Sequence, residues 1–320
     1  MTDSGVTQVS HSPIEAVLAD DLARGDVVLG TIGPMMGILL ASHDHALFSD
    51  EIVARVRSMV ASIARQLLVA EAAAAGEEDA YAFAAERGDA LAGAMAESLP
   101  LLGHCHALAL EHRLATDLER RTSIDPVLSP LLQSLIASSD AETARVAMAL
   151  LAAQARFVQR QRRMELTLEE LPHELFDFAV DCWRTHSGGD TNNAVAQAEQ
   201  RVRDAYDTHE RRASLLERAA GATGDAMQPA MSLAHAGVAL FLTAIALIGK
   251  QDRDLVAVST NESQLGRLSL AMRAAGLKPA DIAEQFALIH PHTSLPDTFD
   301  TLRSDRAGEI LAASGRKALG

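Results

Sequence analysis

Three pairs of histidines, each separated by one residue, are the first groups in this sequence whose spacing could do chemistry. They are His43 and His45, His104 and His106, and His290 and His292. The second pair lies within a predicted helix, where residues two apart project about 200° from each other, so one metal ion cannot readily bind both. Cys105 and His112 share a helical face there, but two ligands alone do not make a structural metal site. Packing is the favoured interpretation, and no cofactor is expected.

His43 and Asp44 suggest a different chemistry, because HD-type phosphohydrolases, which are all-helical, hold metal ions with a His-Asp pair on a helix. The segment ILLASHD resembles that motif, with His11 as a candidate earlier ligand and Asp79 or Asp117 as a candidate later one. No glycine follows the pair, and glycines interrupt the region. A metal-dependent phosphohydrolase is therefore an alternative hypothesis, and a polar loop before the next helix is the simpler interpretation.

His173 is a candidate for a third chemistry, the transfer of a phosphoryl group to histidine. The residues from Pro172 to Leu175 resemble the phospho-accepting box of histidine kinases. The resemblance ends there, because Phe176-Asp177-Phe178 replaces the expected basic and proline positions, and the chain has no glycine-rich ATP lid. A phosphotransfer protein needs only a histidine on a helical hairpin. A phosphotransfer protein acting through His173 or His106 is therefore a second alternative.

Arg156, Arg160 and Arg163 form the most informative cluster of charged residues. Their spacing of four and then three places them on one face of a predicted helix. Guanidinium groups bind carboxylates and phosphates through pairs of parallel hydrogen bonds. The competing interpretation is a solvated face whose arginines pair with nearby glutamates, namely Glu142, Glu165, Glu169 and Glu170. The functional interpretation predicts a surface for an acidic or phosphorylated partner.

The composition narrows the function classes. The 320 residues are 48% hydrophobic and 22% charged, which supports a folded core, and only 3% are aromatic. The formal net charge of −15 disfavours a general binder of nucleic acids or anionic membranes. Two cysteines are too few for a disulfide framework, and the first residues do not resemble a signal peptide. We therefore expect a soluble cytoplasmic protein.

Helix signals recur along the whole chain and no useful period-2 alternation occurs, so the predicted fold is all-α. Capping boxes begin at Ser12 and Ser139, and Gly25 is expected to end the first helix. The residues from Asp190 to Ala220 are expected to form one long polar helix, with an apolar stripe that suits a partner helix. The most apolar segment, Leu233–Gly249, is interpreted as a buried core helix and not as a membrane span.

The same signals suggest a multi-helical array, either HEAT-like or an orthogonal bundle. The stretch from Asp125 to Trp183 has the pattern of stacked helical hairpins, with a tight turn at 138–140. We divide the chain into an N-terminal helical or irregular segment (1–48), an N-terminal helical domain (49–122) and a domain with the character of helical repeats (123–320).

Longer stretches resemble a family of alphaproteobacterial proteins that is known only as a domain of unknown function. The stretches are Leu128 to Pro172, Ala205 to Glu217 and Ala236 to His290, and the resemblance extends over most of the chain after Ser49. The shared motifs are patterns of helix packing. The resemblance implies an all-helical fold and carries no catalytic residues.

The sequence thus favours a non-catalytic scaffold or regulatory adaptor that binds another protein through Arg156, Arg160 and Arg163. Helical arrays offer extended binding surfaces, and the chain shows no obvious set of convergent catalytic groups. A homodimer is compatible with this hypothesis, whereas nucleic acid and membrane are not expected partners. The enzymatic alternative uses His43 and Asp44.

Overall fold

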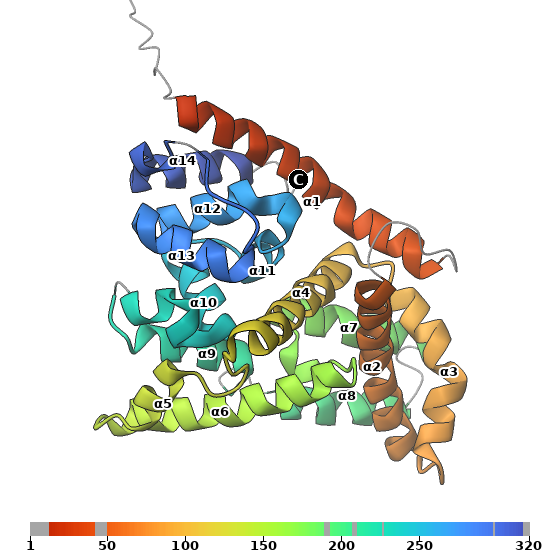
Figure 1. Cartoon of the computed structure of the whole chain (residues 1–320). Helices are drawn as coiled ribbons and strands as arrows, with labels where there is room; N and C mark the ends of the chain where they lie inside the picture. Colours follow the sequence, from red (N-terminus) through yellow and green to blue (C-terminus); the bar gives the residue numbers. More distant parts are fainter. Residues whose placement is uncertain are drawn as a thin grey trace, which may run out of the picture.

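The computed structural model describes residues 13–41, 50–188, 193–206, 210–225, 227–296 and 298–315. It is about 80% helical, with 14 helices and no strand in these ranges, which confirms the predicted all-α multi-helical fold. Figure 1 shows a layered array in which a long N-terminal helix crosses one side of the molecule.

The helices have the following bounds: α1 (Pro13–Ala41), α2 (Asp50–Ala75), α3 (Ala80–Met95), α4 (Leu99–Thr122), α5 (Pro130–Ile136), α6 (Ala141–Arg162), α7 (His173–His186), α8 (Asn193–Ala205), α9 (Arg212–Gly221), α10 (Leu233–Gly249), α11 (Arg253–Ser259), α12 (Leu265–Ala274), α13 (Pro279–Ile289) and α14 (Ser304–Gly315). Two short 3₁₀ helices, η1 (Leu168–Glu170) and η4 (Glu262–Gln264), lie beside α9 and α1, respectively.

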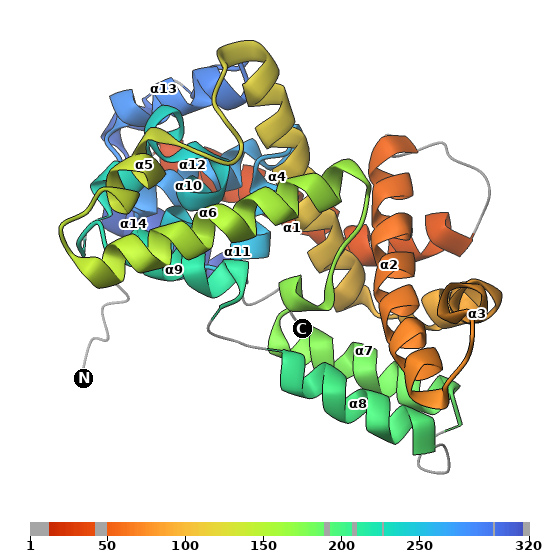
Figure 2. The same cartoon turned by 90° about the horizontal axis from the view of Figure 1, so that it is seen from below.

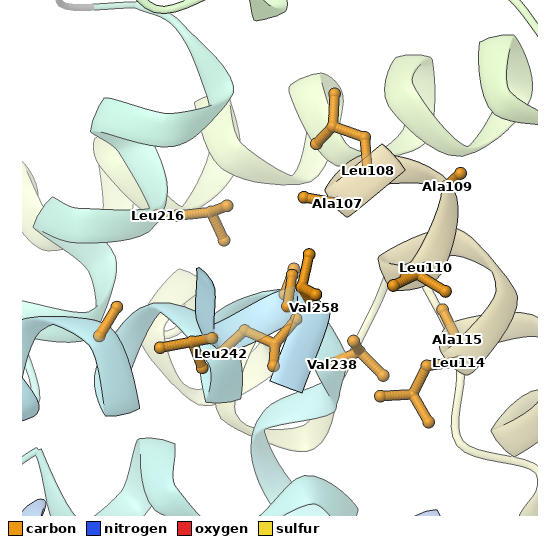
Figure 3. Packing of buried hydrophobic residues seen from close by; sticks show 14 of the residues in the cluster. Ala107, Leu108, Ala109, Leu110, Leu114, Ala115, Leu216, Val238, Leu242 and Val258 are labelled. Carbon is orange, nitrogen blue, oxygen red and sulfur yellow. The ribbon is translucent and has the colours of Figure 1, made fainter. Parts of the chain in front are cut away.

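Helix α4 lies at the centre of the array and packs against α1, α2, α10, α11 and α13. Ser98 caps its first turn through a hydrogen bond from the backbone N–H of Leu101, and the helix ends where Ser123 takes a left-handed conformation. Figure 3 shows side chains such as Leu110, Leu216 and Leu242 in one common core. Because α4 is buried on most of its faces, its polar residues must find partners inside the protein.

Helix α1 is longer than the sequence predicts, because it continues through Gly25 and Pro34 to Ala41. The predicted stop at Gly25 is wrong for a tertiary reason. The carbonyl of Gly25 accepts a hydrogen bond from Gln264 Nε2 of η4 at 2.8 Å, and an added Cβ would lie 2.7 Å from Gln264 Oε1. Glycine therefore serves here for close packing of α1 on η4 and α12, not for helix termination.

The long polar helix predicted from Asp190 to Ala220 is also wrong, since the structure contains two helices there, α8 and α9. The buried positions of α8 are Val195 and Ala198, and α8 packs against α2 within the chain. Helix α9 packs against α6 and α10 instead. The two halves of one charge-rich stretch thus join different parts of the array.

Helices α5 and α6 are joined by the tight turn that the sequence predicts, but α6 is capped by Asp140 and not by Ser139, the first residue of the predicted capping box. Asp140 caps α6 by accepting hydrogen bonds from the backbone N–H and the hydroxyl of Thr143. A HEAT-type repeat of this unit stays a prediction.

Helix α10 is almost entirely buried, as the sequence predicts. In the described part of the chain, no single helix is long and apolar enough to cross a membrane. Helices α10 and α11 are long and apolar enough only when they are taken together, and the chain bends by 117° between them.

Candidate functional site

The three arginines singled out in the sequence lie at the C-terminal end of α6, and all three are exposed. Arg156 and Arg160 belong to the helix proper. Arg163 is the first residue after the helix, where its backbone N–H still donates to the carbonyl oxygen of Arg160. The next residue, Met164, turns the chain through a left-handed conformation. The face predicted from helical spacing is therefore continuous only for the first two arginines.

Of the four nearby glutamates that could neutralise these arginines, three are already paired with other arginines, and Glu169 has no ion pair with a described residue. Glu142 pairs with Arg145 and Arg218, Glu165 with Arg65, and Glu170 with Arg212. Within the described ranges, no carboxylate lies at ion-pair distance from Arg156, Arg160 or Arg163. The tertiary structure thus leaves three exposed guanidinium groups uncompensated in a chain of net charge −15.

Arg156 and Arg160 line one wall of a cleft of about 240 Å³ between α6, η1 and the start of α9. Figure 2 shows α6 and α9 side by side at this point. The opposite wall contains Arg211 and Arg212, and Arg163 is not part of the lining. We call this feature the arginine cleft. The acidic residues in its wall are Glu169, Glu170 and Glu210.

Arg211 adds a third uncompensated cation to the arginine cleft. Its Nη1 donates to the carbonyl oxygen of Leu171 at 2.5 Å and to the hydroxyl of Tyr206 at 2.8 Å, and its guanidinium lies 5.3 Å from the centre of the Tyr206 ring. Its Nε is buried and has no hydrogen-bond partner among the described residues. These contacts fix the side chain in place while leaving its charge unmatched by any described carboxylate.

Arg212 has the opposite role, because it is buried and fully paired. Its guanidinium donates to Glu111 at 2.9 Å and to Glu170 at 2.8 Å, and it lies 3.5 Å from the centre of the Phe157 ring. Burial acts to raise the pKa of Glu111, but the charges of Arg212 and Arg253 outweigh it and hold that pKa well below its usual range. Arg212 and Glu170, both in the cleft wall, thus belong to a network of paired charges.

The histidines of α4 lie in the core. Burial lowers the pKa values of His106 and His112 to about 4, so both side chains are neutral at pH 7. Such a buried site does not suit transfer of a phosphoryl group to His106. His173 is exposed at the start of α7, and its Nε2 lies 3.4 Å from a carboxylate oxygen of Asp177.

His104 forms a contact that the sequence pattern does not predict. Its Nδ1 lies 2.6 Å from Oδ2 of Asp254, on α11. Burial acts to lower the pKa of His104, but the charge of Asp254 and its hydrogen bond outweigh that effect, so the pKa is raised. The spacing of His104 and His106 gives no hint of Asp254, which is 150 residues away in the chain.

The predicted metal ligands His43 and Asp44 lie outside the described residues. Among the residues that the structure does describe, no three side chains of His, Cys, Asp and Glu come together in a way that could hold a metal ion. His104 and Cys105 do not share a site with further ligands there. Burial raises the pKa of the Cys105 thiol above its usual range, which makes it a poor metal ligand.

Arg211 is the residue of the arginine cleft that sequence reasoning missed. In the sequence Arg211 belongs to a charge-rich stretch. The next residue, Arg212, is also an arginine, but it is buried. Only the packing of α9 on α6 distinguishes the two. The sequence signal that could have placed Arg211 at the start of a separate helix is a break in the helical pattern after Ala205.

Comparisons of this chain with models of protein families, with curated proteins and with solved structures found no match. The function proposed next therefore depends on the chemistry of the chain's own residues.

Proposed function

We propose that the protein is a non-catalytic regulatory adaptor that binds an acidic segment of a partner protein in the arginine cleft. The observation that carries this proposal is the convergence of Arg156, Arg160 and Arg211 on one cleft without a carboxylate partner among the described residues. Arginines with this arrangement are suited to bidentate recognition of carboxylates.

The surroundings of the cleft favour selective binding. The protein as a whole is acidic, so an acidic segment is repelled by most of the surface and attracted to this one region. The buried pairing of Arg212 holds that residue of the cleft wall in place, and Arg211 is positioned by Leu171 and Tyr206. Less side-chain entropy is lost on binding when the recognising groups are already held in place.

The size of the cleft points to one or two acidic side chains as its occupants. Its volume is about 240 Å³, and one water molecule in the liquid takes up about 30 Å³. A glutamate or aspartate side chain fits this space, whereas a folded domain can engage it only through a protruding segment. Each hydrogen bond between a guanidinium and a carboxylate contributes about 1.5–3 kcal/mol when it is shielded from water.

The two alternative functions have less support from the described residues. For an HD-type phosphohydrolase, the candidate ligands His43 and Asp44 are not among those residues. A phosphotransfer role would use His173, the exposed member of the two candidate histidines. Neither alternative accounts for the uncompensated arginines.

Binding of a fluorescent peptide of alternating Asp and Glu residues, followed by anisotropy, tests the adaptor proposal. We expect the native protein to bind this peptide and the Arg156→Glu, Arg160→Glu double variant to lose at least about tenfold in affinity. Arg201→Glu is the matched control, because Arg201 is exposed on α8 and does not line the cleft. Circular dichroism should show the same helicity for all three proteins.

Equal binding by the double variant and the Arg201→Glu control would contradict the proposal, and so would the absence of peptide binding to the native protein. Binding that weakens steeply with salt in the native protein and the control, but not in the double variant, would support it.

A further inference from the structure

A second and much larger cavity lies away from the arginine cleft. Its volume is about 1550 Å³, and it is bounded by α1, α4, α14 and the turn between α10 and α11. We call it the α1 cavity, since residues of α1, the helix that runs along one side of the molecule in Figure 1, line it. Pockets of several hundred cubic ångströms are the usual size for binding organic molecules.

Most of the wall of the α1 cavity is apolar. Side chains from four helices contribute: Leu29 and Ile32 from α1, Leu99 from α4, Ile248 from α10 and Leu311 from α14. Leu99 is 46% exposed, so part of its side chain is accessible from the cavity side of α4. This wall suits the hydrocarbon body of a ligand, because burying an apolar body there removes both surfaces from water.

The polar end of the cavity is the turn that joins α10 to α11. Lys250 takes a left-handed conformation with φ of 50°, which is uncommon for a residue other than glycine. Gln251 follows it, and both polar atoms of its side-chain amide are buried without a hydrogen-bond partner in the described part of the chain. A buried amide without partners costs about 1–3 kcal/mol. Both residues line the cavity.

His104 adds a third polar group to this end of the cavity. Its Nδ1 is held by Asp254, in the first turn of α11, and its Nε2 is buried without a hydrogen bond of normal geometry among the described residues. The charge and backbone of Glu170 add to the effect of Asp254 in raising the pKa of His104. Because the pKa of His104 is raised, its protonated form, in which Nε2–H is a donor, is more populated than in a free histidine. Nε2 is closed off from the cavity, so an acceptor on a ligand reaches this donor only when the imidazole turns toward the cavity.

Of the four carboxylates in the cavity wall, three have partners and the fourth, Glu174, has no ion pair with a described residue. Asp254 is bound to His104, and Asp305 pairs with Arg303. Asp252 caps α11 by accepting hydrogen bonds from two backbone N–H groups. Glu174 lies in the first turn of α7, where the helix dipole favours a negative charge.

The cations in the wall are less well matched. Lys250 is exposed and has no ion pair with a described residue. Arg273 donates to the carbonyl oxygens of Leu302 and Leu277, and no described carboxylate pairs with it. At the turn between α10 and α11, the carboxylates of Asp252 and Asp254 are engaged by backbone N–H groups and by His104, so Lys250 is the unmatched charge there. This favours an anionic head group at that end of the cavity.

We propose that the α1 cavity binds an amphipathic carboxylic acid, with the carboxylate at Lys250, Gln251 and His104 and the apolar body along α1 and α4. A rotation of the Gln251 side chain turns its amide from the wall toward the carboxylate. The proposal does not depend on the arginine cleft, because the two sites share no lining residue.

Calorimetric titration with three probes of equal chain length tests the choice of head group. The probes are decanoate, decanol and decylamine, added to the full-length protein. We expect decanoate to bind at least about tenfold more tightly than decanol, and decylamine to bind most weakly. Lys250→Met should remove the preference for decanoate over decanol, whereas Lys278→Met, at an exposed lysine that does not line the cavity, should keep it.

Filling the cavity tests the location. Gly103 lies on α4 in the cavity wall, and a Cβ added there meets no atom within 4 Å, so Gly103→Leu can fold and place its side chain in the cavity. Gly88→Leu is the matched control, since Gly88 also lies within a helix with open space around its Cβ but does not line the cavity. We expect Gly103→Leu to abolish binding of decanoate and Gly88→Leu to leave it unchanged.

Three results would overturn the proposal: no heat of binding with decanoate, decylamine binding as tightly as decanoate, or unchanged decanoate affinity in Gly103→Leu. Urea unfolding of both glycine variants shows whether each retains native stability, so a loss of binding can be assigned to the filled cavity.

Discussion

The arginine cleft and the α1 cavity both contain polar side chains with atoms that lack a partner among the described residues, but they hold them in different ways. In the cleft, Arg156 and Arg160 project into solvent from a single helix. In the cavity, His104 and Gln251 come from distant parts of the chain, and their polar atoms are shielded from water. Charge in the first site is screened by water and salt, whereas the buried His104 of the second acts at a lower effective dielectric constant.

This difference determines what each site is suited to bind. An exposed arginine pair attracts an acidic segment rapidly but contributes little unless the segment excludes water. A shielded polar end next to an apolar wall can hold a small molecule through burial as well as charge. The buried network of Glu111 links the two regions, because Glu111 binds Arg212 at the cleft and Arg253 at the turn beside the cavity.

Arg212→Ala should have the largest effect on this comparison, because it removes a buried partner from both Glu111 and Glu170. We expect a loss of about 3–5 kcal/mol in the free energy of unfolding. Urea unfolding followed by circular dichroism measures it. Arg218→Ala, on the same helix as Arg212, breaks a pair with the exposed Glu142 of α6 and should cost less than about 1 kcal/mol. If both variants lost similar amounts of unfolding free energy, burial would not explain the difference between the Arg212 and Arg218 ion pairs.

Acidification should weaken the core around α4. The pKa values of His106 and His112 are about 4 in the folded protein, below the usual 6.5, so the unfolded chain binds more protons between these values. Stability should therefore fall as pH decreases from 6.5 toward 4, by up to about 3 kcal/mol for each histidine. Unfolding free energies at pH 7 and pH 5 measure this.

His104 works in the opposite direction, since its pKa is raised. Its contribution to stability is present below the unfolded pKa of about 6.5 and is lost as pH rises through its folded pKa. His106→Gln should make the fall in stability on acidification smaller, whereas His104→Gln should make it steeper. A pH dependence that neither variant changes would contradict these assignments.

Gly25→Ala tests how α1 is held beside the cavity. The added methyl displaces Gln264 and breaks its hydrogen bond to the Gly25 carbonyl. We expect this variant to be about 1–2 kcal/mol less stable than Gly30→Ala, where an added Cβ meets no atom within 4 Å and the higher helix propensity of alanine acts alone. Urea unfolding and limited proteolysis of α1 compare them. Equal stability would show that the α1 contact at Gly25 is not tight.

The smallest effect on stability is expected at the arginine cleft. Arg160→Ala removes an exposed side chain without an ion pair to any described residue, so the free energy of unfolding should change by less than about 0.5 kcal/mol. Binding of the acidic peptide should nevertheless weaken. A variant that loses stability but keeps peptide binding would assign Arg160 a structural role instead.

The sequence by itself determined the helical content of this protein, because the signals for it are local. The capping of α6 by Asp140 and the apolar run of α10 depend on residues within one element. The shared face of Arg156 and Arg160 follows from helical spacing in the same way. Local signals misled where packing outweighed them, as at Gly25 and at the break between α8 and α9.

Only the tertiary structure decided which charges are satisfied. Arg211 and Arg212 are adjacent and chemically identical, yet one lines a cleft without a described carboxylate partner and the other lies in a buried ion network. The pairing of His104 with Asp254 joins residues 150 positions apart. Electrostatic partners are set by distances in space and by burial, and neither quantity is encoded in the spacing of residues along one helix.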